Sequence, residues 1–170
     1  MIYVVRHGET EWNAINKVLG RTDIPLNAKG IKQARELARS MKDLKIDSFL
    51  CSPLLRTRQT ADIISREIDV QYEIDNRLIE QEFGEFEGVD RSDPKYQKAK
   101  REYFVRYPGG ESYFDMAARV FTLLKELAGT NALLVTHGGI CRIIRSYFED
   151  MGNEEFVRFC QGNCEIRRYD

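Results

Sequence analysis

The chain lacks several features that would assign it to a specialised class of proteins. Its 170 residues hold only four cysteines, without the spacing of a zinc site. The net charge is −1, so no overall basic field would draw the chain to nucleic acid or to an acidic membrane. No apolar run approaches transmembrane length, and Met1 leads into a short apolar segment rather than a signal peptide. We therefore expect a cytoplasmic domain with reduced thiols and with neither a nucleic-acid nor a membrane partner.

Histidine is also scarce, and its placement is informative. The two histidines, His7 and His137, each end a short apolar segment and precede glycine, in MIYVVRHG and ALLVTHGG. A continuous apolar run of this length predicts a strand buried on both faces, and the glycine predicts a tight turn out of the sheet. Ligand sites of parallel sheets gather at the carboxyl ends of strands. Two histidines at that edge, one beside Arg6, point to phosphate chemistry.

Alternating strand and helix patterns predict a single α/β domain over residues 1–170. The expected strands are 1–5, 47–51, 70–74, 132–135 and 164–169, and the expected helices are 11–17, 28–44, 54–67, 94–107, 112–127 and a segment ending at 148. We expect a three-layer sandwich, in which helices cover both faces of a mostly parallel sheet and the last strand lies at an edge. The polar insertion at about 76–112 is expected to form a small, lid-like lobe of helix and loop above the carboxyl ends of the strands.

The second predicted strand runs into Ser52-Pro53, which is typical of a helix start with Ser52 as the cap and Pro53 at the first helical position. Arg56 would then lie near the first turn, at the same sheet edge as both histidines. A helix start offers free N–H groups and a partial positive charge, and the planar guanidinium of arginine binds phosphate oxygens in pairs. We expect these groups, with Arg6, to converge on one anion.

Six segments in order are Arg6–Asn13, Asp23–Ala34, Ser52–Ala61, Glu80–Gly88, Pro108–Ser112 and Val135–Gly139. Together they resemble the histidine phosphatase superfamily, also called the phosphoglycerate mutase-like family. Arg-His-Gly alone is a weak match, but six matches in the order of the family are specific and span nearly the whole chain. The stretch EQEFGEFEG looks most like the small bacterial members, such as the broad-specificity and α-ribazole phosphatases.

The resemblance implies that His7 is the nucleophile and forms a phosphohistidine that water later hydrolyses. An imidazole attacks only when it is unprotonated, and nearby arginines should keep His7 neutral. Its other ring nitrogen would bond to a backbone carbonyl in the turn at Gly8. The resemblance assigns phosphate binding to Arg6, Asn13, Arg56 and His137. The resemblance implies no metal or other cofactor, because the protein's own side chains supply the positive charge.

The leaving oxygen needs a proton from an acid. The loop 76–88 offers Glu80, Glu82, Glu85 and Glu87, and spacing alone does not choose between them. In the family the acid lies four residues before the glycine matched here by Gly84, which selects Glu80 and leaves Glu82 as the alternative. The other glutamates are expected to be solvated loop charges.

Other residues have two interpretations. Gly20 and Arg21 are candidates for the rim of the substrate pocket, as is Gly138, although a plain surface loop would explain the first two nearly as well. The basic stretch 95–106 predicts the solvated face of a helix. The alternative is a lid in which Tyr103 or Phe104 contacts the substrate.

Two features favour a phosphatase over a mutase. After His137 the chain reads Gly138-Gly139, as the phosphatases tend to, whereas mutases usually read Gly-Asn. The segment 89–108 is also short, whereas a mutase needs extra basic contacts to retain a bisphosphate. The expected function is metal-independent hydrolysis of a small phosphorylated metabolite through a phosphohistidine. The alternatives are phosphoglycerate mutase-type transfer and, from another class, a catalytically inactive phosphate-binding scaffold. The sequence predicts neither the natural substrate nor the oligomeric state.

Overall fold

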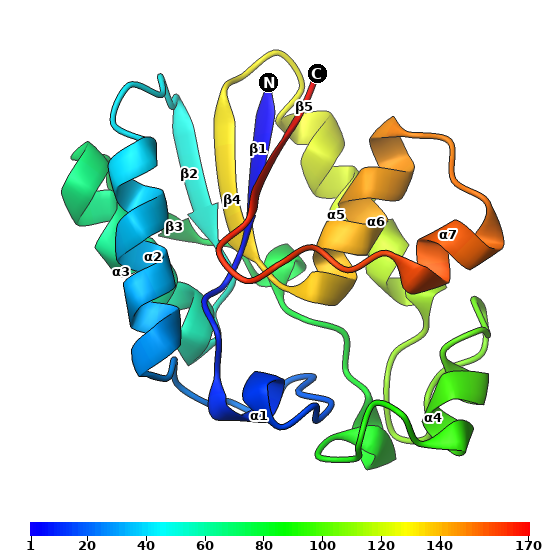
Figure 1. Cartoon of the computed structure of the whole chain (residues 1–170). Helices are drawn as coiled ribbons and strands as arrows, with labels where there is room; N and C mark the ends of the chain where they lie inside the picture. The colour runs from blue at the N-terminus through cyan, green and yellow to red at the C-terminus, as the bar shows by residue number, and fades with distance from the viewer.

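The computed structural model describes residues 1–170 and shows a five-stranded sheet between two layers of helices (Figure 1). The strands are β1 (Ile2–Arg6), β2 (Ser48–Cys51), β3 (Glu73–Ile74), β4 (Ala132–Thr136) and β5 (Ile166–Tyr169). Their order is β3-β2-β4-β1-β5, and only β5 is antiparallel to its neighbour. The predicted α/β architecture with a mostly parallel sheet is therefore confirmed, with β5 at an edge as expected.

Helices cover both faces because the central strands are apolar on both sides. The helices that pack on the sheet are α2 (Ala28–Ser40) and α3 (Leu55–Ile68) on one face, and α5 (Tyr113–Glu126), α6 (Gly138–Phe148) and α7 (Asn153–Arg158) on the other. Alternate residues of β1 divide between the two cores: Val4 packs with α5 and α6, and Val5 with α2 and α3. All five residues of β4 are buried. Burial on both faces is what a continuous apolar run predicts.

The pairing of β1 with β4 sets the position of the two histidines. Arg6 pairs with Thr136 at the end of the ladder, so His7 and His137 are the next residues on adjacent strands. The amide of His7 donates to the carbonyl of Thr136 at 3.0 Å, which continues the ladder by one bond. The sheet therefore holds both imidazoles side by side at the carboxyl ends of β1 and β4.

Short elements form a lobe beyond this edge (Figure 1). They are α1 (Glu11–Ala14), the 3₁₀ turn η2 (Gly84–Phe86) and α4 (Pro94–Ala99), whereas the 3₁₀ turn η1 (Asn76–Leu78) packs against β4 and α5, with Leu78 in the main core. The lobe has its own small apolar cluster of Val18, Phe83, Tyr96 and Tyr107. Backbone hydrogen bonds join Val18 to Val89 and to Gly88, which ties the loop after α1 to the 76–112 segment.

Several local predictions were wrong in extent. The helix predicted at Ser52-Pro53 begins at Leu55, because the Ser52 hydroxyl bonds to His137 instead of capping the helix. The helix predicted over 94–107 ends at Ala99. The other predicted elements over 11–17, 28–44 and 70–74 are shorter than expected, and α7 was not predicted. None of the helices combines the length and apolar character that crossing a membrane demands.

Candidate active site

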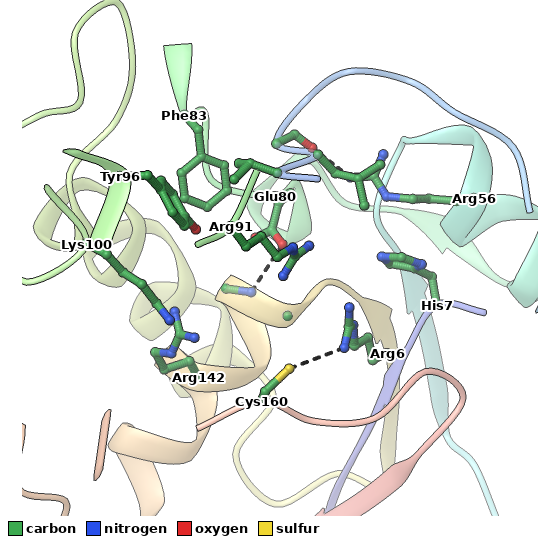
Figure 2. A pocket seen from close by; sticks show the side chains of 15 residues that line it. Arg6, His7, Arg56, Glu80, Phe83, Arg91, Tyr96, Lys100, Arg142 and Cys160 are labelled. Carbon is green, nitrogen blue, oxygen red and sulfur yellow. Dashed lines mark hydrogen bonds between the residues drawn. The ribbon is translucent and has the colours of Figure 1, made fainter. Parts of the chain in front are cut away.

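One pocket at the carboxyl ends of β1 and β4 brings together most of the residues that the sequence pointed to (Figure 2). Of the fifteen lining residues, six are predicted site residues: Arg6, His7, Gly20, Arg56, Glu80 and Gly138. The side chains that would do the chemistry are nearly inaccessible, with exposed fractions of 7% for Arg6, 2% for His7, 0% for Arg56 and 8% for Glu80. Electrostatic interactions in such a desolvated site are stronger than in water.

The imidazole of His7 has the orientation and charge state of a nucleophile. Its Nδ1 lies 2.7 Å from the carbonyl oxygen of Gly8, as expected. Because a carbonyl oxygen only accepts, Nδ1 carries the hydrogen and Nε2 keeps its lone pair. The pKa of His7 is held well below its usual value, first by burial and then by the positive charges of Arg56 and Arg6. His7 is therefore neutral at physiological pH.

The two predicted arginines are anchored by backbone carbonyls rather than by carboxylates. Arg6 donates to the carbonyl oxygen of Gln161 at 2.6 Å, and Arg56 to those of Thr22 and Gly20 at 2.9 and 2.6 Å. These bonds fix the guanidinium groups without neutralising their charge. The Nε atoms of both Arg6 and Arg56 are buried without a hydrogen-bond partner.

The ring of His137 is a direct neighbour of the ring of His7. The ring centroids are 5.2 Å apart, and His137 is fully buried without lining the pocket. Its Nε2 lies 2.6 Å from the Ser52 hydroxyl, and its Nδ1 is buried without a partner. Burial, followed by the charge of Arg56, lowers the pKa of His137 well below its usual value.

Buried polar atoms without partners are uncommon in folded proteins. Eight side-chain atoms of this chain are of that kind, and four of them belong to the predicted phosphate ligands: Arg6 Nε, Asn13 Nδ2, Arg56 Nε and His137 Nδ1. All four are nitrogens able to donate. Their concentration in this part of the molecule is what an anion-binding site requires.

Glu80 also lines the pocket, on the side where Phe83 and Arg91 lie (Figure 2). Its carboxylate accepts from the amide of Gly139 at 3.1 Å and from that of Gln81 at 2.9 Å. The alternative acid, Glu82, does not line the pocket and forms an ion pair with Arg21 at 3.1 Å. The geometry therefore favours Glu80 over Glu82 as a proton donor.

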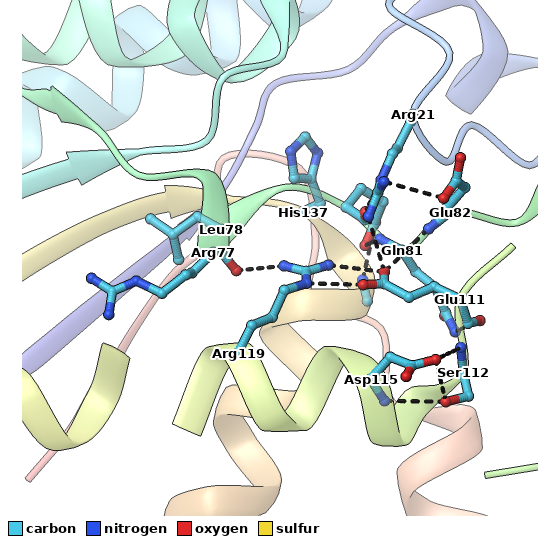
Figure 3. Close-up of polar contacts among 12 residues, drawn as sticks. Arg21, Arg77, Leu78, Gln81, Glu82, Glu111, Ser112, Asp115, Arg119 and His137 are labelled. Carbon is cyan, nitrogen blue, oxygen red and sulfur yellow. Dashed lines mark hydrogen bonds and ion pairs between the residues drawn. The ribbon is translucent and has the colours of Figure 1, made fainter. Parts of the chain in front are cut away.

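A partly buried ion-pair network holds the segment that carries Glu80 (Figure 3). Arg119 donates twice to Glu111, at 3.0 Å each, and Glu111 also lies 3.3 Å from a guanidinium nitrogen of Arg21. Arg21 in turn donates to the backbone carbonyl of Glu80 at 3.3 Å. Gln81 donates to the carbonyl of Glu111 at 3.1 Å. The segment 80–82 is therefore fixed from several sides.

Besides His137, two predicted residues lie outside the pocket lining. Asn13 is the third residue of α1 and completes the capping box with the N-cap Thr10: its Oδ1 accepts from the amide and hydroxyl of Thr10, and only its Nδ2 has no partner. Arg21 points away from the rim to Glu82 and Glu111, so of the predicted loop residues only Gly20 contributes to the wall.

The neighbouring glutamate Glu87 is not the solvated loop charge that was expected. Its carboxylate accepts from the amides of Arg21 and Thr22, both at 2.9 Å, and from the Thr22 hydroxyl at 2.5 Å. It thereby holds the loop whose carbonyls anchor Arg56.

The pocket also contains residues that the sequence interpretation missed. Arg91 and Lys100 enter from the lobe and Arg142 from α6. The basic stretch 95–106 is thus not only a solvated face. Tyr103 and Phe104, the residues proposed for lid contacts, line a separate apolar groove with Phe114. Arg142 lies four residues after Gly138 and therefore on the same face of α6, a spacing from which its place in the pocket could have been predicted.

Comparison with known proteins agrees with this geometry. A family model of the histidine phosphatase superfamily (branch 1) matches residues 2–170. The probable phosphoglycerate mutase GpmB of Escherichia fergusonii is 33% identical over 180 residues, which cover 99% of this chain and 84% of that protein. A solved mycobacterial glucosyl-3-phosphoglycerate phosphatase superposes with a TM-score of 0.83 at 26% identity, over 97% of this chain and 87% of the other. A putative alpha-ribazole-5'-P phosphatase from Escherichia coli has the same fold, with a TM-score of 0.83 at 24% identity over 97% and 87% of the two chains. This chain belongs to the histidine phosphatase superfamily, branch 1.

Proposed function

We propose that the protein hydrolyses phosphate monoesters of small metabolites through a phosphohistidine at His7, without a metal or other cofactor. The observation that carries the proposal is the neutral, buried His7, oriented through Nδ1 by Gly8 and flanked by the charges of Arg6 and Arg56. Such a group combines an available lone pair with fixed positive charge around the acceptor phosphorus.

In the first step, Nε2 of His7 attacks phosphorus while the bond from phosphorus to the ester oxygen breaks. Arg6, Arg56 and His137 stabilise the charge on the phosphoryl oxygens in the transition state. Glu80 delivers a proton to the departing oxygen, so that the alcohol leaves neutral. In the second step water attacks the phosphohistidine, Glu80 takes the proton of that water, and inorganic phosphate leaves His7.

Phosphoglycerate mutase-type transfer is the second candidate. The cations Arg91, Lys100 and Arg142 favour it, because a mutase needs basic contacts to retain a bisphosphate, and a short lobe had been expected to lack them. The GpmB relative carries the same activity in its name. Isomerisation of phosphoglycerate that outpaced release of inorganic phosphate would establish the mutase.

The test begins with hydrolysis of p-nitrophenyl phosphate by the purified protein and by His7→Gln. We expect His7→Gln to be inactive, and rapid acid-free quenching of the wild type to trap an acid-labile, base-stable phosphate on the N-terminal peptide. Brisk turnover with that peptide unlabelled would reject the mechanism. An unreactive wild type across pH 5–8 that still bound inorganic phosphate would favour the scaffold alternative.

Arg56 and Arg58 provide a matched pair on α3. Arg56 is fully buried in the pocket, whereas Arg58 is exposed. Arg56→Gln should reduce kcat/KM about a hundredfold or more, because a charge-assisted contact to the transferring phosphoryl group is lost. Arg58→Gln, with the same change of charge two positions away, should retain wild-type kcat/KM.

A further inference from the structure

The backbone leaves the sheet at the peptide that joins His7 to Gly8. His7 follows the last residue of β1, and its amide makes the final ladder bond, to the carbonyl oxygen of Thr136. The next carbonyl oxygen along the chain is that of Gly8, and it accepts the hydrogen of His7 Nδ1 at 2.7 Å. The orientation of the His7–Gly8 peptide therefore decides whether the imidazole keeps this acceptor.

Two side chains from distant parts of the chain hold the two ends of this peptide. Asn163 donates through Nδ2 to the carbonyl oxygen of His7 at 2.9 Å. The hydroxyl oxygen of Thr60 accepts from the amide of Gly8 at 3.1 Å. Asn163 lies 156 residues from His7, and Thr60 lies 52 residues from Gly8, so neither bond belongs to a local turn. Both polar groups of the peptide are satisfied by side chains, which fixes the rotation of the peptide plane.

Thr60 is itself oriented for this contact. It is fully buried on α3, and its hydroxyl donates to the carbonyl oxygen of Arg56 at 2.8 Å. Since the single hydrogen of the hydroxyl is used on the helix, its oxygen meets the amide of Gly8 as an acceptor. The contact joins the turn after β1 to the helix that carries Arg56.

Asn163 belongs to the segment 160–165, which passes the end of β1 before β5 begins (Figure 1). The amide of Cys164 donates to the carbonyl oxygen of Arg6 at 2.9 Å, and the carbonyl oxygen of Gln161 accepts from the Arg6 guanidinium at 2.6 Å. The backbone of Cys164 is left-handed, with φ of 54°, which is uncommon for a residue other than glycine. Such a conformation persists where the surrounding contacts impose it. The segment is therefore held against Arg6, and Asn163 with it.

The glycine at position 8 explains why the peptide needs to be held. A Cβ built on Gly8 would stand 2.6 Å from the carbonyl oxygen of Gly30, so the close packing of this turn requires glycine. Glycine is also the residue with the greatest backbone freedom. If the carbonyl of Gly8 turned away, His7 would lose the acceptor that selects its tautomer. The hydrogen could then move to Nε2, the atom that attacks phosphorus in the proposed reaction.

We propose that Asn163 and Thr60 are positioning residues that clamp the His7–Gly8 peptide and thereby keep the hydrogen of His7 on Nδ1. Neither residue lines the pocket, so the clamp acts through the carbonyl of Gly8 and not on the substrate. The effect on turnover rests on the proposed function, because it takes Nε2 of His7 to be the attacking atom. The effect on the imidazole is measured without turnover.

Nitrogen-15 NMR of the imidazole rings reports the tautomer directly. The chain has only two histidines, so comparison with His7→Gln assigns the ring signals of His7 and His137. At pH 7.5 the wild-type signals of His7 should show a hydrogen on Nδ1. Asn163→Ala and Thr60→Val should each move His7 toward the tautomer with the hydrogen on Nε2, while the tautomer of His137 stays as in the wild type.

Steady-state kinetics on p-nitrophenyl phosphate measure the consequence for turnover. Asn163→Ala and Thr60→Val should each lower kcat about tenfold or more, because a histidine in the wrong tautomer is a poor catalyst. The change in KM should be smaller, since Arg6 and Arg56 still meet the phosphate. The double variant should lose little more kcat than the less active single variant, because the two residues hold the same peptide.

Thr122→Val and Asn153→Ala are the matched controls. The Thr122 hydroxyl donates to the carbonyl oxygen four residues earlier, as that of Thr60 does, but it accepts no hydrogen bond. Asn153 is exposed at the start of α7. Both controls should keep the wild-type tautomer and kcat. Thr60→Ser, which retains the hydroxyl, should recover most of the kcat lost in Thr60→Val.

Circular dichroism establishes that each variant is folded. A folded Asn163→Ala or Thr60→Val protein that keeps the hydrogen of His7 on Nδ1 would overturn the proposal, as would a wild type with that hydrogen on Nε2. A change of tautomer in both variants of a protein whose wild type hydrolyses no phosphate ester would support the clamp and reject the proposed function. An unchanged tautomer together with brisk wild-type hydrolysis would reject the clamp and leave the hydrolysis intact.

Discussion

The carboxylate of Glu80 occupies the space that a side chain at position 139 would fill. A Cβ built on Gly139 would stand 2.5 Å from Glu80 Oε1, while the Gly139 amide donates to Oε2 at 3.1 Å. The second glycine after His137 therefore has a physical role: it lets the acid approach the start of α6. A larger residue there would force the carboxylate or the helix to move.

The first prediction is that Gly139→Ala displaces Glu80 and impairs proton delivery. We expect kcat/KM for an alkyl phosphate such as glycerol 3-phosphate to fall about 10- to 100-fold. The loss for p-nitrophenyl phosphate should be smaller, because nitrophenolate leaves without being protonated. Steady-state kinetics on the two substrates measure the difference. Gly152→Ala is the control, since a Cβ at Gly152 meets no atom within 4 Å. Equal losses on both substrates would argue against a displaced acid.

The second prediction concerns Ser52 as a positioning residue for His137. Ser52→Ala removes the group 2.6 Å from His137 Nε2 and leaves that nitrogen buried without a partner. We expect kcat to fall about tenfold with a smaller change in KM, and unfolding free energy to fall by about 1–3 kcal/mol. Urea unfolding and steady-state kinetics measure the two effects.

Thr57→Val is the matched control for Ser52→Ala. The Thr57 hydroxyl is equally buried but bonds to the carbonyl oxygens of Ser52 and Leu54. It should cost stability without the same loss of kcat. A Ser52→Ala enzyme with wild-type kcat would show that the hydroxyl serves the fold alone.

Sequence patterns predicted those parts of the site that are local in the chain. His7 and His137 follow apolar strands directly, so their meeting at one edge follows from parallel pairing of β1 with β4. Ser52 was wrongly predicted to cap a helix, because the Ser-Pro pattern reports only on neighbouring residues. The actual hydrogen-bond partner of its hydroxyl, His137, lies 85 residues away. Local propensity was overridden there by a tertiary hydrogen bond.

The cations Lys100 and Arg91 were missed for a related reason. Whether a lobe residue faces solvent or the pocket depends on how Phe83, Tyr96 and Tyr107 pack together, and that packing joins segments far apart in sequence. The helical periodicity over 94–107 could not predict which way these side chains face, since α4 ends at Ala99.

The third prediction is a loss of stability at mildly acidic pH. The pKa values of His7 and His137 are lowered in the folded protein, whereas the unfolded chain takes up protons near pH 6.5. Below about pH 6.5 the unfolded state therefore binds more protons, and stability falls with pH until the folded-state pKa values are reached. Between pH 7.5 and 5.5 we expect a loss of about 1 kcal/mol for each histidine. Urea unfolding at several pH values measures it.

A variant isolates the contribution of one histidine. His137→Gln removes one of the two titrating groups, so its stability should decline about half as steeply between pH 6.5 and 5.5. The comparison uses slopes, because the substitution also changes the absolute stability. An unchanged slope in His137→Gln would mean that other groups cause the acid sensitivity.

The last prediction tests the network that holds Glu80. Glu111 accepts from Arg119 and lies within 3.3 Å of Arg21, which reaches the backbone of Glu80. Glu111→Gln weakens both ion pairs in a largely buried setting, where an unpaired charge is costly. We expect the ratio of kcat/KM for the alkyl phosphate to that for p-nitrophenyl phosphate to fall several-fold, and amide exchange over residues 79–83 to accelerate.

Arg106→Gln is the control: it breaks only the exposed ion pair with Asp115, and it should change neither quantity. Because phosphorylation of His7 by p-nitrophenyl phosphate needs no acid, Glu111→Gln should retain most of that activity. A uniform loss of kcat/KM on both substrates would show that the network supports the phosphate site as a whole rather than the acid Glu80 alone.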